Sequence, residues 1–279
     1  MFKAKIMKKR LIFNFYIDDG WRDNHINKIH FYCLNYFKNV FTEMVFMVSL
    51  NDVNNIRLIY DFEQYILSLE LCPNIQFMVK KNHIFREAKN FYDEIALKLG
   101  ELDGLTFFGH NKGITNYDSP YYIKEDVEMW VTSMYYGCLK RPEEMEYDLT
   151  DGRHLAYGTL LDVIELNRDD DPLYFDSMGL WLGKRRYFYM GTFFWMNCPM
   201  IKYYMDSNNI ELPKLVDRWY AENLFANIFD VYHCGSFDMR KTYNYLEVGT
   251  KNITDIINYS FGDEMGDYLN FHNKVLESI

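Results

Sequence analysis

A lysine in a glycine-bounded segment is the feature of this sequence that most directly indicates ligand chemistry. Lys112 lies in residues 109–113 (GHNKG), directly after the apolar residues 105–108. Glycine lets a backbone approach a phosphate group closely, and lysine supplies a compact positive charge. His110 could donate a hydrogen bond to a phosphate oxygen or a sugar hydroxyl. The other interpretation of the segment is a surface turn with an exposed lysine.

Glu222 is the candidate general base, the group that would take a proton from a hydroxyl, and Asp217 is the second candidate. Residues 215–229 have the periodicity of a helix, and Arg218 lies four positions before Glu222. Side chains at that spacing share one helix face, so Arg218 and Glu222 are expected to lie together. A surface ion pair would have the same spacing.

Other polar residues give weaker indications of a site. Asp18 and Asp19 end the first predicted strand, where a carboxylate can accept a hydrogen bond from a ribose hydroxyl or can simply form a capping turn. Residues 169–171 form an acidic triplet that we interpret as a solvated loop. His233 and Cys234 could contact a metal or a phosphate, although a structural role is the commoner one for a single histidine.

The first 110 residues alternate between predicted strands and predicted helices. Apolar, β-prone runs predict the strands, and apolar residues at helical spacing predict the helices between them. The predicted strands are 11–17, 43–50, 75–79 and 105–108, and the predicted helices are 23–39, 53–71 and 85–99. This alternation favours an α/β fold with a mostly parallel central sheet flanked by helices. Ligands of such sheets bind beyond the carboxyl ends of the strands, where Asp18 and Lys112 lie.

The rest of the chain is predicted to be mainly helical. One strongly β-prone run predicts a strand over residues 187–195, and residues 155–166 fit either a helix or a strand. The predicted helices are 123–139, 197–205 and 215–229, followed by helical stretches over 254–279 that break near Gly262 and Gly266.

The composition excludes several classes of protein. The 30 basic and 40 acidic residues give a net charge of −10, which disfavours binding to nucleic acid. Apolar runs such as 11–17 and 191–196 are far shorter than the roughly 20 residues of a membrane span. The five scattered cysteines indicate reduced thiols in the cytoplasm. The basic residues between Lys3 and Arg10 are either a solvated tail or a contact with the inner face of an anionic membrane.

Three segments in a fixed order resemble a group of glycosyltransferases found in polysaccharide and O-antigen synthesis gene sets. They are residues 105–114 (LTFFGHNKGI) with Trp130 downstream, residues 189–201 (YMGTFFWMNCPMI) and residues 217–229 (DRWYAENLFANIF). The group has a strand ending in His-Thr-Lys-Gly, a later Gly-Asn-Phe-Trp-Trp-like strand and an Arg-x-x-x-Glu helix. This sequence departs from that pattern at Asn111, Thr192 and Phe194.

The resemblance implies a type-A glycosyltransferase fold, with a mostly parallel sheet and a helical C-terminal part, in a single domain over residues 1–279. Residues 10–115 would bind the nucleotide sugar and residues 116–235 the acceptor. Residues 236–279 would form a C-terminal extension.

The resemblance also implies roles for individual residues. The donor would be bound by Asp18, Asp19, His110, Asn111, Lys112, Gly113, Gly191 and Thr192, and the acceptor by Trp130, Trp195 and Arg218. Many such enzymes bind Mn²⁺ or Mg²⁺ through an Asp-x-Asp motif after the fourth strand, but GHNKG occupies that place here. We therefore expect no metal site there, and we expect Lys112 and His110 to stabilise the diphosphate.

The expected function is transfer of a sugar from a nucleoside-diphosphate sugar, with a UDP-sugar as the expected donor. The acceptor would be an oligosaccharide, a lipid-linked glycan or a protein-linked glycan. A non-catalytic sugar- or nucleotide-binding domain of the same fold is the alternative. A nucleotidyltransferase is less consistent with the sequence, because that class carries a glycine-rich basic loop after the first strand, where this chain has Asp18-Asp19-Gly20-Trp21.

Overall fold

The computed structural model describes residues 7–111, 113, 117, 120, 123–164, 186–218, 220–229, 231–236, 243–244 and 261–279. Its strands form one sheet in the order β3-β2-β1-β4-β6-β5-β7, and β8 pairs with β5. The strands are β1 (Lys9–Tyr16), β2 (Glu43–Leu50), β3 (Ile75–Lys81), β4 (Leu105–His110), β5 (Ala156–Ile164), β6 (Arg186–Asn197), β7 (Cys234–Ser236) and β8 (Tyr243–Asn244).

Most strand pairs in this sheet are parallel. Strand β1 is parallel to β2 and to β4, β2 is parallel to β3, and β7 and β8 are parallel to β5. Strand β6 is antiparallel to both β4 and β5. The expected α/β fold with a mostly parallel central sheet is therefore confirmed.

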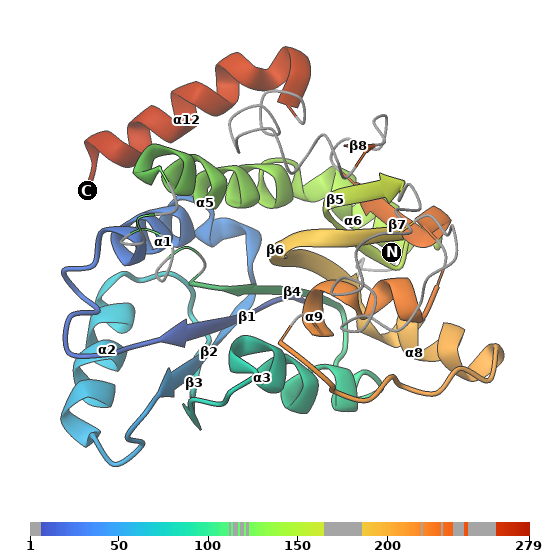
Figure 1. Ribbon diagram of the computed structural model, residues 1–279, viewed down its shortest axis with the longest axis horizontal. Coiled ribbons are helices and arrows are strands. Elements are labelled where there is room, and N and C mark those ends of the chain that lie inside the picture. Colours follow the sequence, from blue (N-terminus) through green and yellow to red (C-terminus); the bar gives the residue numbers. More distant parts are fainter. Residues whose placement is uncertain are drawn as a thin grey trace, which may run out of the picture.

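Helices cover both faces of the sheet (Figure 1). Helices α1, α2, α5, α6 and α12 contribute to the core on one face, and α3, α8 and α9 to the core on the other. Their bounds are α1 (His25–Tyr36), α2 (Ile56–Ser68), α3 (Arg86–Glu94), α5 (Lys124–Leu139), α6 (Pro142–Thr150), α8 (Cys198–Ser207), α9 (Tyr220–Asn223) and α12 (Met265–Glu277).

Alternation along the strands explains why both faces are apolar. In β1, Phe13 and Phe15 face the α1 side, while Ile12 faces the α3 side, and all three are buried. A strand places successive side chains on opposite faces, so a strand covered on both faces must be apolar throughout. This explains why the runs in β1, β2 and β4 are nearly continuous and lack a polar face.

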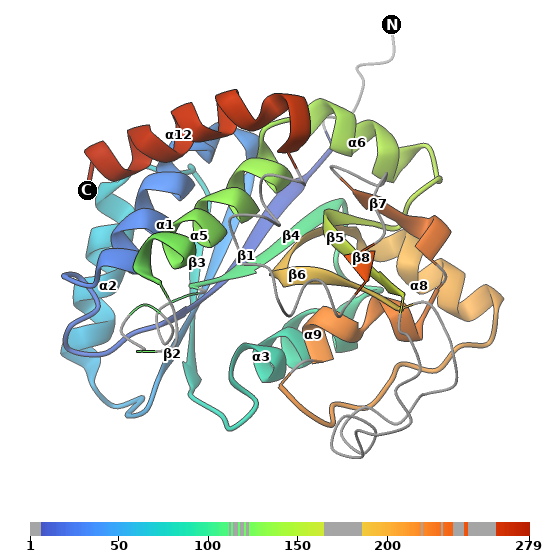
Figure 2. The ribbon, with the colours of Figure 1, turned by 45° about the horizontal axis from the view of Figure 1, so that its top comes forward.

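The C-terminal helix α12 packs across α1 and α5 (Figure 2). Lys140, just after α5, forms a 2.9 Å ion pair with Glu264. Within the interface, Thr132 Oγ1 of α5 lies 3.0 Å from Tyr268 Oη and 2.9 Å from His272 Nδ1. Because these groups are buried, α12 is held by polar contacts as well as by apolar packing.

The prediction of one helix over residues 215–229 is wrong. Residues 211–216 have no regular structure, α9 covers only Tyr220–Asn223, and a 3₁₀ helix follows over Phe225–Asn227. The Pro213 carbonyl accepts a 2.7 Å hydrogen bond from Tyr220 Oη, which ties the irregular segment to α9. The apolar residues whose spacing suggested a continuous helix lie instead in and around these two short helices, where Leu224 and Phe229 are buried.

Other predictions for the second half need smaller corrections. The ambiguous segment 155–166 contains strand β5, and Gly266 lies inside α12 rather than at a break. Helix α6 was not predicted, although Pro142 at its first turn and the acidic residues after it are ordinary start signals. The segment 169–171 lies outside the described residues. No helix in the described part of the chain is long and apolar enough to cross a bilayer.

We expect the burial of His272 to make stability depend on pH. Burial lowers the pKa of His272, and the nearby Glu128 carboxylate raises it by a smaller amount. The unfolded chain therefore binds this proton more readily than the folded chain does. This contribution to the free energy of unfolding should be complete above about pH 6.5 and should be lost as pH falls from there to the lowered pKa.

Urea unfolding of the wild type and His272→Gln between pH 8 and pH 5 tests this expectation, because the difference between the two curves isolates His272. The wild type should lose more stability than the variant on acidification. Parallel pH dependences for the two proteins would contradict it.

Candidate functional site

The carboxyl ends of β1, β2, β3 and β4 meet at one edge of the sheet, which we call the carboxyl edge. Asp18 and Asp19 follow β1 there and are exposed. Asp18 Oδ1 accepts a 3.0 Å hydrogen bond from the Gly20 N–H, and its carbonyl accepts one from Trp21. Asp18 therefore stabilises the turn, and its Oδ1 is occupied by the Gly20 N–H. The Asp19 carboxylate lies on the surface beside it.

His110, the last residue of β4, lies against the helix on the α3 face. It is only 7 % exposed, and its Nε2 is 4.0 Å from Glu87 Oε1 of α3. Its ring also lies 6.2 Å from the Phe193 ring of β6. The imidazole is therefore fixed between the sheet and α3 at the carboxyl edge, with a carboxylate beside it.

A buried polar network that we did not predict lies beside His110. Asn14 Oδ1 of β1 accepts hydrogen bonds from Ser49 Oγ at 2.9 Å and from Asn90 Nδ2 at 2.6 Å. Asn90 Nδ2 also lies 2.8 Å from Ser49 Oγ. The one available signal was Asn14 itself, a polar residue inside an apolar strand, because asparagine is depleted in strands. The network ties β1, β2 and α3 together beneath the carboxyl edge.

Asn111 is bound to its neighbours through both ends of its side chain. Its Oδ1 accepts a 3.0 Å hydrogen bond from the Tyr16 N–H, and its Nδ2 donates to the Tyr16 carbonyl at 2.8 Å and to Asn27 Oδ1 at 3.1 Å. The Asn111 N–H also donates to the Asn14 carbonyl. These bonds fix the start of the loop after β4 on the end of β1 and on the first turn of α1.

Gly113 brings the same loop against α5. Its φ is +92°, and a Cβ there would lie 2.9 Å from Val127 and 3.1 Å from Val131, both in α5. Only glycine meets both requirements without a shift of its neighbours. Lys112 lies outside the described residues, between Asn111 and Gly113, which are both fixed.

Gly191 and Thr192 lie in β6, where its pairing with β5 is irregular. The register shifts between the pairs Gly158–Phe194 and Leu160–Tyr189, which leaves residues 190–193 in a bulge. The side chain of Thr192 lies outside the described residues. Bulges bend a strand and redirect its side chains. Phe193 is the last residue of this bulge, and its ring lies 6.2 Å from that of His110.

Trp195 is a core residue. Its exposed fraction is 0 %, its Nε1 donates a 2.9 Å hydrogen bond to the Cys138 carbonyl, and its ring stacks on Phe41 at 5.4 Å. An acceptor therefore has no access to this side chain as it is folded. Trp130 of α5 is partly buried against the same core.

The predicted residues of the third segment lie on the opposite face. Helix α9 packs against α3 and β6, and its backbone carries Glu222, whose side chain lies outside the described residues. Asp217 and Arg218 precede this helix in a bend and a turn. The expectation that Arg218 and Glu222 share one helix face is therefore wrong.

Two buried cysteines, Cys33 and Cys198, are poor nucleophiles. All five are free, and four of them are buried. Burial raises the pKa of Cys33 well above its usual range and that of Cys198 to about 12. Such thiols stay protonated at neutral pH, so they act as packing groups. Among the described residues, no cluster of three or more His, Cys, Asp or Glu side chains could hold a metal ion.

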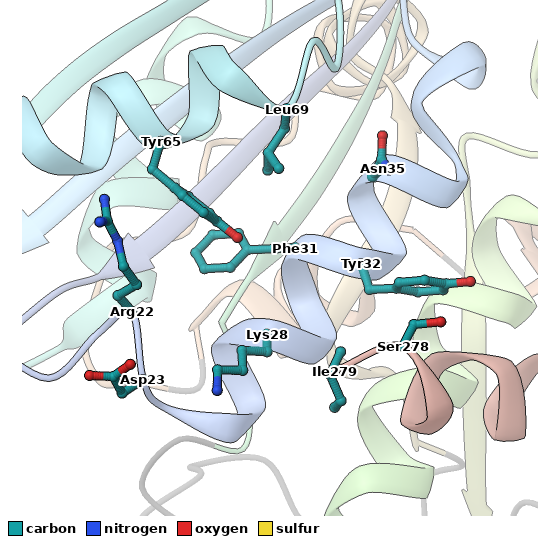
Figure 3. Close-up of a pocket in the computed structure, with 10 residues that line it drawn as sticks. All are labelled: Arg22, Asp23, Lys28, Phe31, Tyr32, Asn35, Tyr65, Leu69, Ser278 and Ile279. Atoms are coloured by element: carbon teal, nitrogen blue, oxygen red, sulfur yellow. The ribbon is translucent and has the colours of Figure 1, made fainter.

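A cavity of about 400 Å³ lies away from these residues, between α1, α2 and the end of α12 (Figure 3). Arg22 at its rim lies 5.3 Å from the Tyr65 ring and 5.2 Å from the Trp21 ring. None of the predicted site residues lines it. Its lining is Arg22, Asp23, Lys28, Phe31, Tyr32, Asn35, Tyr65, Leu69, Ser278 and Ile279.

Comparison with known proteins adds little to the site. No family model matches the sequence, and no curated protein matches it. Among solved structures, 4-diphosphocytidyl-2C-methyl-D-erythritol synthase from Anaerococcus prevotii DSM 20548 has a TM-score of 0.33 and 12 % identity over 77 % of this chain and 82 % of that chain. A second structure of a synthase of that name has a TM-score of 0.32 and 9 % identity over 78 % and 84 %. At these scores the similarity carries no assignment of activity.

We expect Asn111→Ala to destabilise the fold. The substitution leaves the Tyr16 N–H and carbonyl without their side-chain partner, and an unsatisfied buried polar group costs about 1–3 kcal/mol. The free energy of unfolding, measured by chemical denaturation, should fall by about 1–3 kcal/mol. Asn54→Ala, at an exposed asparagine, is the matched control and should change stability little. Equal losses for the two variants would contradict the bonding described for Asn111.

Proposed function

We propose that this chain is a glycosyltransferase that moves a sugar from a nucleoside-diphosphate sugar to a glycan acceptor, with a UDP-sugar as the first donor to test. The observation that carries the proposal is the placement of Asn111 and Gly113, the neighbours of Lys112 in the sequence. Asn111 bonds to β1 and α1, and Gly113 packs on α5. The proposal also draws on the resemblance of the three sequence segments.

The chemistry assigned to this loop is stabilisation of the leaving group. When the bond between the sugar and the diphosphate breaks, negative charge develops on the phosphate oxygen, and a cation or N–H donors must meet it. Lys112 would supply the charge, and His110 would donate a hydrogen bond. Since a lysine needs no metal to do this, we propose that donor binding is metal-independent.

The remaining donor contacts belong to the same edge. Asp19, exposed beside the Asp18 turn, would accept a hydrogen bond from a ribose hydroxyl. Gly191 and Thr192 in the β6 bulge would lie below the sugar. Glu222 is the proposed base from the sequence, with Asp217 second, and Arg218 is the proposed acceptor contact. The acceptor would be an oligosaccharide or a lipid- or protein-linked glycan.

A non-catalytic binding domain is the second candidate function. Burial of Trp195 favours it, because this residue would have been an acceptor contact. Commitment of the Asn111 side chain to internal hydrogen bonds also reduces the number of groups left for a donor. Binding of a nucleotide without turnover on any acceptor would support this function.

Nucleotide binding is the first test. With EDTA present, UDP at 100 times its dissociation constant should add about 2.7 kcal/mol to stability and raise Tm by roughly 5 °C. Lys112→Ala should abolish the rise, whereas Lys202→Ala, at an exposed position of α8, should retain it. A rise that requires Mn²⁺ would contradict metal-free binding. No rise with UDP, GDP, CMP or dTDP would contradict donor binding altogether.

A further inference from the structure

A histidine, a glutamate and a tyrosine form a hydrogen-bonded cluster next to the loop after β4. His25 Nε2 lies 2.7 Å from Glu128 Oε1, and Tyr117 Oη donates to the same oxygen at 3.1 Å. The His25 and Tyr117 rings stack at 5.1 Å, and Lys124 Nζ lies 4.6 Å from the Tyr117 ring. The three side chains come from different segments, namely the start of α1, the start of α5 and the residues between β4 and α5.

The hydrogen bonds define which nitrogen of His25 is free to accept a proton. A carboxylate only accepts hydrogen bonds, so His25 Nε2 must carry the hydrogen that points at Glu128. The neutral ring then has its lone pair on Nδ1, and no described residue bonds to that atom. A carboxylate that holds one imidazole nitrogen in this way orients the ring and stabilises the imidazolium that forms after proton transfer.

The exposure of the two partners matches these roles. The Glu128 side chain is 12 % exposed, while that of His25 is 36 % exposed. The carboxylate is thus shielded and the imidazole is open to solvent on one side. A pair that served only to join α1 to α5 would work equally well with both partners buried.

Two contacts place this cluster beside the proposed donor loop. Asn27, in the first turn of α1 with His25, accepts a hydrogen bond from Asn111 Nδ2 at 3.1 Å. Gly113, on the other side of Lys112, accepts a 2.8 Å hydrogen bond from the Tyr117 N–H. The loop that would hold the diphosphate is therefore bonded to the segments that carry His25 and Tyr117.

We propose that His25 is the general base of this enzyme and that Glu128 is its positioning residue. The inference rests on the proposed function. In the step, the acceptor oxygen forms a bond to the anomeric carbon, and the bond from that carbon to the diphosphate oxygen breaks. The electron pair leaves with the nucleoside diphosphate, and the acceptor proton passes to His25 Nδ1. Glu222, on the opposite face of the sheet, then has no part in proton transfer.

The test uses the full chain and UDP-glucose, UDP-galactose or UDP-N-acetylglucosamine, with water as the acceptor. Released UDP measures turnover, and the Tm rise with UDP measures nucleotide binding. His25→Ala should keep the rise and lose turnover by about 10²–10⁴-fold, the usual contribution of a general base. Added imidazole should restore part of the lost turnover, because the half-exposed side chain leaves a space that imidazole can enter.

Three further variants complete the design. Glu128→Gln should lower kcat without changing KM, and imidazole should not rescue it. His154→Ala is the matched control, since His154 Nδ1 lies 3.6 Å from Asp148 Oδ2 in another histidine–carboxylate pair, which precedes β5. This variant should keep wild-type turnover, whereas Glu222→Gln decides between His25 and Glu222 as the base.

The outcomes separate the two proposals. Wild-type turnover that survives His25→Ala, or a loss in His25→Ala that imidazole does not restore, overturns the assignment of His25 and leaves the proposed function standing. A loss confined to Glu222→Gln overturns it in favour of Glu222. Absence of turnover in the wild type with every UDP-sugar overturns the proposed function, and the assignment of His25 falls with it.

Discussion

The hydrogen bonds between the Asn111 side chain and the peptide groups of Tyr16 are the constraint on which the site depends. They align the loop after β4 with the end of β1, and the third bond, to Asn27, brings α1 to the same point. A side chain with one acceptor and one donor end is required, because Tyr16 presents both an N–H and a carbonyl. Asn111 thus fixes the start of the loop between His25 and His110.

The first half of the fold could be predicted from the sequence because its signals are local. The run Glu43–Leu50 is mostly apolar and forms β2 over the same residues, and the helices between the strands carry clear caps such as Asn24 and Asn55. In the second half, the prediction was wrong where one sequence pattern fits two different structures. Residues 215–229 have helical spacing, yet the chain forms two short turns there, because burial of Leu224 and Phe229 requires only that spacing.

The candidate site was harder to predict because its side chains are placed by tertiary contacts. Trp195 and Asn111 belong to segments that indicate a ligand site, but one fills the core and the other bonds to β1. His25 and Glu128, in contrast, lie 103 positions apart and carry no motif. A sequence pattern indicates which segments matter to the protein. It does not show whether their side chains contact a ligand or a neighbouring strand.

The two ends of the parallel strands also differ in how their charges are arranged. At the amino ends, buried Arg10 pairs with Glu43 and with Asp103 at 2.9 Å, and Lys8 pairs with Glu43. The Arg10 hydrogen bond lowers the pKa of Asp103, so these groups satisfy one another within the fold. At the carboxyl edge, Asp19 is exposed, His25 is bonded through one nitrogen, and His110 lies on the other face of the sheet. A substrate that reached both histidines would have to lie across the ends of β1 and β4, because His25 belongs to α1 on one face of the sheet and His110 lies against α3 on the other.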